Sequence, residues 1–316
     1  MPAEVETLMY TSNEENGRFV PWHGLGTAVA EAPTSADAIK LAGLDWNVNS
    51  EPIFTQNGIE IPNHKANIRT TDNKVLGVVS DRYRIVQNID AFDFTDNLIG
   101  DNCHYETAGS LNGGKRIFLL AKMPEKKIVE DNFDNYICFT NSHDGLGAIK
   151  ICMTPVRVVC QNTLNLALSN ATRNWSTRHV GDLASKLDEA KHTLQMADDY
   201  MKELAITADK LAHTKITEDE AVKIIDELYP ISDDMSDRQK ANIAESKNQF
   251  YVCMFAPDIL KYKGTAWQLI NAASDFATHT APKRMTPSYQ ENNFSRILDG
   301  NVIIDKTFEK LMAKVK

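Results

Sequence analysis

A change of periodicity near Gly181 is the feature that most constrains how this chain folds. Beyond it, apolar residues recur at alternating intervals of four and three, at Leu183, Leu187, Ala190, Leu194, Ala197, Met201, Leu204, Ala208 and Leu211. This spacing places one apolar stripe along a long helix. The stripe predicts either packing against the rest of the chain, which its alanines favour, or self-association into a homo-oligomer.

The residues before Gly181 are patterned as strands. Runs rich in Val, Ile, Thr and aromatic residues cover 46–55, 59–70, 75–86, 115–123, 136–141 and 148–159. Turn-forming pairs such as Asn57-Gly58 separate them, because these residues tolerate the positive φ that tight hairpins need. Short helices are expected at 35–42, 89–99 and 161–169. The pattern predicts an α+β fold, with a mostly antiparallel twisted sheet in residues 1–181 and a helical region in residues 182–316.

Three further helices are expected in the C-terminal half. Thr217 and Glu220 have the spacing of a capping box, which opens a helix that Pro230 closes after Tyr229. The polar stretch 232–239 leads into a second helix, and Gly264-Thr265 precedes a third, well-patterned one at 266–278. The helical region is predicted to pack on the strand-rich part or to mediate self-association.

The composition is that of a globular protein of about two domains, with 316 residues, 42% hydrophobic and 24% charged. No apolar run reaches the ~18 residues of a membrane span, and the first ten residues lack the pattern of a secretory signal. An odd number of cysteines without a Cys-x-x-Cys pair favours reduced thiols, at Cys103, Cys138, Cys152, Cys160 and Cys253. We expect a cytoplasmic protein with no cofactor and no membrane partner.

The charge distribution leaves two interpretations open. The net charge of −9 disfavours a protein that coats duplex DNA, since phosphate neutralisation needs clustered Lys and Arg. However, residues 145–181 contain no Asp or Glu, while they include Lys150, Arg157, Arg173 and Arg178. This stretch is either a local positive surface or a largely buried segment.

Three motifs combine cations with aromatic rings or glycines, as contacts to an unpaired nucleic-acid strand require. Their candidate residues are Arg82, Tyr83 and Arg84, then Lys115 and Arg116 after the glycines at 113 and 114, and finally Arg173, Trp175, Arg178 and His179. In the first motif the two arginines are expected on one side of a strand, with Tyr83 on the other. Each motif also has a purely structural interpretation, as an ion pair with Asp81, a hairpin turn or a core anchor.

A fourth motif lies at an expected strand-to-helix step. Arg157 is followed by the polar residues Gln161, Asn162 and Asn165, and a helix N-terminus near a cation suits phosphate or base-edge contacts.

Ser142, His143, Asp144 and Cys160 together resemble the parts of a hydrolase. Neighbouring side chains on a strand point apart, so only a Cys160–His143 dyad across paired strands is geometrically reasonable. The histidines lack the i, i+4 spacing of a helical metal-ligand pair, so no metal site is expected.

These motifs, in this order, resemble the phage/plasmid-like protein family catalogued as domain of unknown function 932. The resemblance runs from Pro21 through His279 and rests on segments 21–26, 42–46, 81–88, 105–114, 140–145, 154–168, 175–179 and 264–267. It implies residence in phages, prophages and plasmids of a bacterial host, and it carries no catalytic residue. At the level of fold, the strands leading into 156–168 are also similar to phage single-strand annealing proteins.

The leading hypothesis is a single-stranded DNA-binding protein that acts in recombination or replication of a mobile element. In it the arginines and lysines of the motifs neutralise phosphates, Tyr83 and Trp175 stack on bases, and Gln161, Asn162 and Asn165 make polar contacts. The alternative is a non-enzymatic antagonist that binds a host defence protein through its acidic surface. A third hypothesis is a hydrolase or nuclease that uses Cys160, His143 and Asp144.

Overall fold

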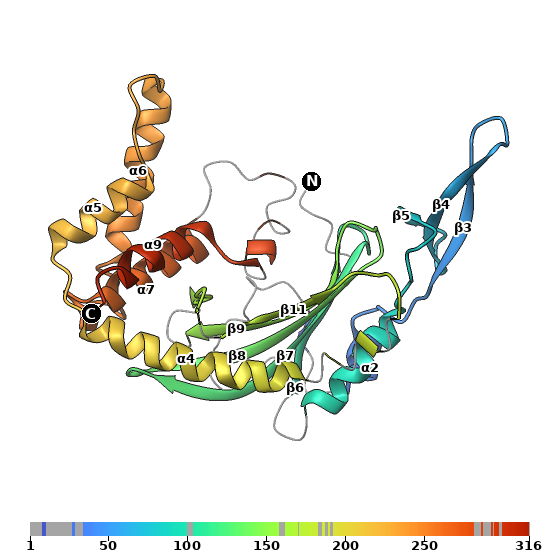
Figure 1. The fold of residues 1–316 in the computed structure, drawn as a ribbon, viewed down its shortest axis with the longest axis horizontal. Coiled ribbons are helices and arrows are strands. Elements are labelled where there is room, and N and C mark those ends of the chain that lie inside the picture. The colour runs from blue at the N-terminus through green and yellow to red at the C-terminus, as the bar shows by residue number, and fades with distance from the viewer. Residues whose placement is uncertain are drawn as a thin grey trace.

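The computed structural model describes residues 8–10, 27–28, 34–99, 104–157, 162–169, 171–182, 185–186, 189, 192–280, 286, 292, 294–296 and 299–315. Within them a large curved sheet forms the centre of the molecule, with a small sheet at one end and two projecting helices at the other (Figure 1). Strands dominate the N-terminal half and helices the C-terminal half. The predicted α+β class is confirmed.

The large sheet has the strand order β10-β9-β8-β7-β6-β1-β2, with β11 also paired to β9. Its strands are β1 Leu8–Tyr10, β2 Thr27–Ala28, β6 His104–Leu111, β7 Arg116–Ile128, β8 Asp131–Ser142, β9 Ile149–Arg157, β10 Asn162–Thr163 and β11 Asn174–Thr177. Apart from the parallel pair β1 and β2, neighbouring strands are antiparallel. The long strands β7, β8 and β9 form its middle.

Both faces of these middle strands are apolar. Side chains such as Leu119, Ile137 and Ile151 contribute to one large core, and Leu120, Cys138 and Cys152 belong to a separate cluster with Phe294. A strand buried on both faces has no polar alternation. This explains the continuous buried run along β8.

Helix α4 (Thr193–His213) packs on the large core, alongside α7 (Ala266–His279). The described part of the predicted apolar stripe is buried inside the monomer, at Ala197, Met201, Leu204, Ala208 and Leu211. The residues of the stripe before Thr193 have no described side chains. Because residues from Ala38 to Leu311 share this core, the two halves of the chain are joined by one apolar interior.

The small sheet projects from one end of the large sheet (Figure 1). It consists of β3 (Val48–Phe54), β4 (Glu60–Arg69) and β5 (Val75–Ser80) in that order, all antiparallel. Helix α1 (Ser35–Leu41) precedes it and α2 (Asn88–Ile99) follows it. Positive φ angles at Gly58 and Asn73 shape its two turns, as the sequence predicts.

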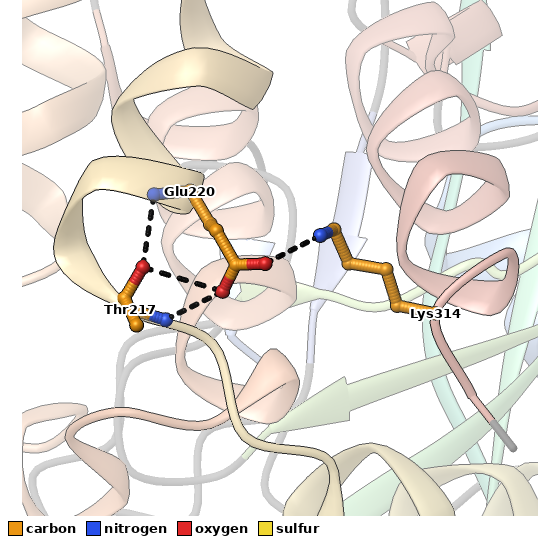
Figure 2. A network of polar contacts seen from close by, with 3 residues as sticks. All are labelled: Thr217, Glu220 and Lys314. Atoms are coloured by element: carbon orange, nitrogen blue, oxygen red, sulfur yellow. Dashed lines mark hydrogen bonds and ion pairs between the residues drawn. The ribbon is translucent and has the colours of Figure 1, made fainter.

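The remaining elements are α5 Glu218–Leu228, α6 Asp237–Cys253, the 3₁₀ turn η3 Leu260–Tyr262 and α9 Val302–Met312. The predicted capping box of α5 is present: the Thr217 hydroxyl accepts from the Glu220 amide at 3.2 Å, and Glu220 Oε2 accepts from the Thr217 amide at 2.9 Å (Figure 2). Lys314 Nζ lies 2.7 Å from the same carboxylate, and these contacts lower the pKa of Glu220 to about 2, with the Lys314 hydrogen bond as the largest cause. The box therefore also ties α5 to the end of the chain.

The structure corrects two expected elements. The strand expected at 75–86 ends at Ser80, so Arg82 and Arg84 lie in a loop rather than on one side of a strand. The helix expected at 161–169 is absent from the described residues there; β10 is followed by irregular chain. Leu164 and Leu166 both enter the core, and the Tyr200 hydroxyl binds the backbone N–H and C=O of Leu166 at 3.0 and 2.9 Å, which replaces the helical hydrogen bonds.

The strands β6 and β11 lie outside every run in which a strand was expected. The motif at 21–26 lies outside the described residues. Within the described part of the chain, no helix has the length and apolarity of a membrane span.

Candidate nucleic-acid interface at the junction of the two sheets

Three loops meet where the small sheet joins the large one. They are 81–88 from the end of β5 to the first residue of α2, 142–148 from the last residue of β8 to the start of β9, and 178–182 after β11, and we call their meeting point the junction. The Tyr83 hydroxyl donates to the carbonyl oxygen of Ser142, and its ring stacks on His179 with centroids 4.6 Å apart. Gly77 of β5 approaches so closely that a Cβ there would lie 2.5 Å from Cα of Asp144. The first loop is therefore in direct contact with the other two, and β5 lies against the 142–148 loop.

The backbone of Arg84 pairs directly with His179. The Arg84 amide donates to the His179 carbonyl at 2.7 Å, and His179 Nδ1 lies 3.1 Å from the Arg84 carbonyl. Because a carbonyl only accepts, Nδ1 carries the proton. These two contacts bring the Arg82–Arg84 loop beside Arg178, although the two segments are 95 residues apart.

Arg82, Arg84 and Arg178 are exposed. None of the three forms an ion pair with another residue that the structure describes. Tyr83, between the two arginines of the loop, is 6% exposed. The loop therefore has the alternation expected of the sequence, although it is not a strand.

His143 lies at the centre of the junction and is fully buried. Its Nε2 is 2.8 Å from Oδ1 of Asn88, whose amide donates to the Leu44 carbonyl at 2.7 Å. Since Oδ1 can only accept, Nε2 carries a proton. Burial, followed by the nearby His179, lowers the pKa of His143 to about 3.

Side chains bound to backbone atoms hold the rest of the junction. Asn67 of β4 donates to the His143 carbonyl at 2.8 Å, and Asn141 donates to the Val86 carbonyl at 2.9 Å. The Ser142 hydroxyl donates to Asp144 Oδ1 at 2.6 Å, which also accepts the Leu146 amide at 2.8 Å. The carboxylate of Asp144 thus organises its own loop.

Lys115 and Arg116 belong to the same end of the large sheet. The His143 amide donates to the Lys115 carbonyl at 2.8 Å, and Arg116 is the register partner of Ser142. Both side chains are half-buried, and the Arg116 guanidinium lies 3.5 Å from the Ser295 hydroxyl. Five predicted cations therefore lie at the junction end, namely Arg82, Arg84, Lys115, Arg116 and Arg178.

Arg157 lies away from the junction. It closes β9, eight residues beyond Ile149, which corresponds to about 27 Å along a strand. Its backbone pairs with Asn162, and the side chains of both residues fall outside the described set, as do Cys160 and Gln161. Asn165, which follows, is buried. The arrangement of a Cys160–His143 dyad is therefore not described.

The third motif is divided between the core and the surface. Trp175 is half-buried and pairs with Ile151, and Arg173 donates to the Met153 carbonyl at 3.3 Å. Both line a cavity of about 10 Å³ against α4, together with Ile137, Ile151, Met153, Met196 and Ala197. His179 is 3% exposed, so only Arg178 of this motif is at the surface.

The sequence did not single out several residues of the junction. Lys65 Nζ donates to the Tyr83 carbonyl at 3.0 Å and adds a half-buried cation beside the loop. Asn67 is completely buried, but it lies in a strand with several other polar residues, so its sequence context gives no signal. Trp46, whose ring meets His143 edge-on at 5.3 Å, belongs to the segment 42–46 of the family resemblance, but nothing in that segment indicates a contact with His143. In the described residues, no group of three His, Cys, Asp or Glu side chains is arranged to hold a metal ion.

Comparison with known proteins gives a single family. The family model described as "Domain of unknown function (DUF932)" matches residues 75–298. No curated protein and no solved structure matches the chain. The matched segment contains all three junction loops and the strands from β6 to β11. Because the match covers more than half of the chain, the protein belongs to the DUF932 family.

Proposed function

We propose that this protein binds single-stranded nucleic acid at the junction, in recombination or replication of a phage or plasmid. Arg82, Arg84 and Arg178 are the primary phosphate contacts, and Lys65, Lys115 and Arg116 extend the positive region. The observation that carries the proposal is the backbone pairing of Arg84 with His179, which brings two distant segments that carry exposed arginines side by side. A bound anion would offset the repulsion between such neighbouring cations.

The arrangement favours a short single strand over a duplex. A duplex-binding surface needs a wide field of cations, whereas the chain as a whole carries a net charge of −9. A small cluster of arginines neutralises a few phosphates. The acidic surface around it repels the rest of a stiff polyanion. A flexible single strand can bend into such a site and turn away from the acidic surface on either side, whereas a stiff duplex cannot bend in this way.

The aromatic rings have a different role from the one that the sequence favours. Tyr83 and His179 stack on each other and are buried, and Trp175 packs against the α4 side of the sheet. Neither Tyr83 nor His179 presents a free face to a base in this arrangement. Binding through phosphates alone is insensitive to base sequence and strongly dependent on salt.

The test is the binding of a fluorescent oligothymidylate of about twenty nucleotides, followed by anisotropy over a range of salt concentrations. Each neutralised phosphate of a single strand contributes about −0.7 to the slope of log K against log salt, so three to five contacts predict a slope of about −2 to −3.5. A duplex of the same sequence should compete poorly. Absence of binding at low salt, or binding that salt does not weaken, would contradict the proposal.

The other two hypotheses predict different properties of the junction. A hydrolase that uses His143 requires the junction to open, because the imidazole is 0% exposed. An antagonist of a host protein would use the acidic surface, so neutralising the junction arginines would leave its partner binding intact. The oligonucleotide experiment separates the antagonist from the proposal, since an antagonist does not predict salt-sensitive binding to a single strand. A nuclease is distinguished by cleavage of the bound oligonucleotide, which the proposal does not predict.

A further inference from the structure

Two cysteines face each other across the middle of the large sheet. Cys138 of β8 and Cys152 of β9 are direct register partners, and both are free thiols. Residues directly opposite each other in an antiparallel pair have Cα atoms about 4.5 or 5.5 Å apart. Both spacings fall within the ~4.4–6.8 Å that a disulfide spans, so the backbone need not move to join them.

The side chains also lie on the same face of the sheet. Alternation along β8 and β9 places both thiols on the face that carries Leu120 and Tyr136, where they belong to one apolar cluster with Phe294. The two thiols affect each other's ionisation, and the Cys152 sulfur lies 3.9 Å from the Thr154 hydroxyl. The exposed fractions are 0% for Cys138 and 2% for Cys152. The pair is therefore in contact and shielded from solvent.

The two thiols differ in their tendency to ionise. The neighbouring Cys138 thiol lowers the pKa of Cys152; burial opposes this, and the guanidinium of Arg173 lowers the pKa further. Burial raises the pKa of Cys138. Cys152 is thus the better nucleophile and Cys138 the thiol that follows it.

We infer that Cys138 and Cys152 are a modification site, at which a small hydroperoxide converts the pair into a cross-strand disulfide. Because both thiols are buried, the peroxide reaches them when the strands open locally. The Cys152 thiolate then attacks the peroxide oxygen, which breaks the O–O bond and leaves a sulfenic acid. The Cys138 sulfur then attacks the Cys152 sulfur, the S–O bond breaks, and the hydroxide leaves as water with the Cys138 proton. In total, two thiols and one hydrogen peroxide give one disulfide and two waters, and a dithiol reductant reverses the result.

The disulfide would connect the two strands that carry the 142–148 loop. This loop contributes His143 and Asp144 to the junction, so oxidation constrains the strands directly beneath it. A covalent link across the loop restricts the unfolded chain and is expected to shift the urea midpoint upward. The inference does not depend on the binding of nucleic acid.

The experiment uses the unmodified chain and a peptide map made without reduction. Trypsin cuts after Lys150, so Cys138 lies in the fragment 128–150 and Cys152 in 151–157. After brief treatment with hydrogen peroxide and alkylation in denaturant, the two fragments should appear joined, with the summed mass lowered by two hydrogens. Dithiothreitol should restore both as alkylated fragments.

A variant with Cys103, Cys160 and Cys253 all changed to alanine provides the matched control, because only the pair remains. Its thiol count should fall from two to zero, while a further Cys138→Ala change should leave a sulfenic acid that a dimedone probe traps. Cys253 is an internal reference in the unmodified chain, since burial, and then the nearby Asp275, raise its pKa to about 12. The inference is overturned if Cys138 and Cys152 stay separate at a dose that modifies Cys253, or if either is linked to another cysteine.

Discussion

The phenol ring of Tyr83 lies flat against the imidazole of His179, with an interplanar angle of 13°. The contact joins the loop that leaves the small sheet to the segment that leaves β11. On either side of it are the exposed arginines at 82, 84 and 178. The stacked pair is therefore buried beside these three arginines. We expect its stability to determine how well the arginines are positioned.

Tyr83→Phe removes only the hydroxyl that donates to the Ser142 carbonyl. The stack is retained, while a buried carbonyl loses its partner, so the free energy of unfolding should fall by about 1–3 kcal/mol. Urea denaturation measures the change. Tyr251→Phe is the matched control, because that hydroxyl donates to Glu218 at the surface and its removal should not change the midpoint measurably. Equal behaviour of the two variants would mean that the Tyr83 hydrogen bond does not hold the junction.

His143 makes stability depend on pH. Its folded-state pKa of about 3 lies below the 6.5 of an unperturbed histidine, so the unfolded chain binds the proton more tightly. The contribution is fully present above about pH 6.5 and is lost as the pH falls toward 3, by about 1.4 kcal/mol per unit for this group. Burial also lowers the pKa of His179, which adds in the same direction.

The dependence is measured by urea denaturation at pH 7 and pH 5. His143→Gln should reduce the loss of stability between these two values by about 2 kcal/mol, whatever its effect at pH 7. His64→Gln, at an exposed position of β4, should retain the full loss. If the His143 variant loses as much as the unmodified chain, the buried neutral imidazole does not control this dependence.

Gly77→Ala tests the close approach of β5 to the 142–148 loop. The added Cβ would meet backbone atoms of Asp144 at 2.5–2.8 Å, so one of the two segments must shift. Overpacking of this kind costs about 1–3 kcal/mol. Val75→Ala on the same strand, with a side chain 53% exposed, should have a much smaller effect. Full stability of Gly77→Ala would show that the two sheets are not in fixed contact there.

Local patterns predicted the elements that depend on neighbouring residues in the chain. The Thr217–Glu220 capping box, the turn at Gly58 and the apolar stripe of α4 are each set by a few adjacent positions. The α+β class followed from these elements. Where long-range contacts dominated, the prediction was wrong: the backbone of Leu166 is bound by Tyr200, so the expected helix there does not form.

The candidate site was only partly accessible from the sequence. The motif around Tyr83 and the one that ends in His179 were recognised separately, but neither indicated that their rings stack on each other. Asn67, Asn88 and Trp46 surround His143 from three different elements and lack a common motif. Their convergence depends on the docking of the small sheet, which no local spacing encodes.

The most direct measurement compares two triple variants that carry the same net charge. Arg82→Ala with Arg84→Ala and Arg178→Ala removes the junction arginines, and Lys127→Ala with Arg238→Ala and Lys263→Ala removes exposed cations elsewhere; each changes the net charge from −9 to −12. Anisotropy with the oligothymidylate at low salt should show at least a roughly tenfold weaker affinity for the junction variant, together with a salt slope that is shallower by about 2. The control variant should bind nearly as tightly as the unmodified chain. Equal affinities for the two variants would contradict the assignment of the junction as the binding site.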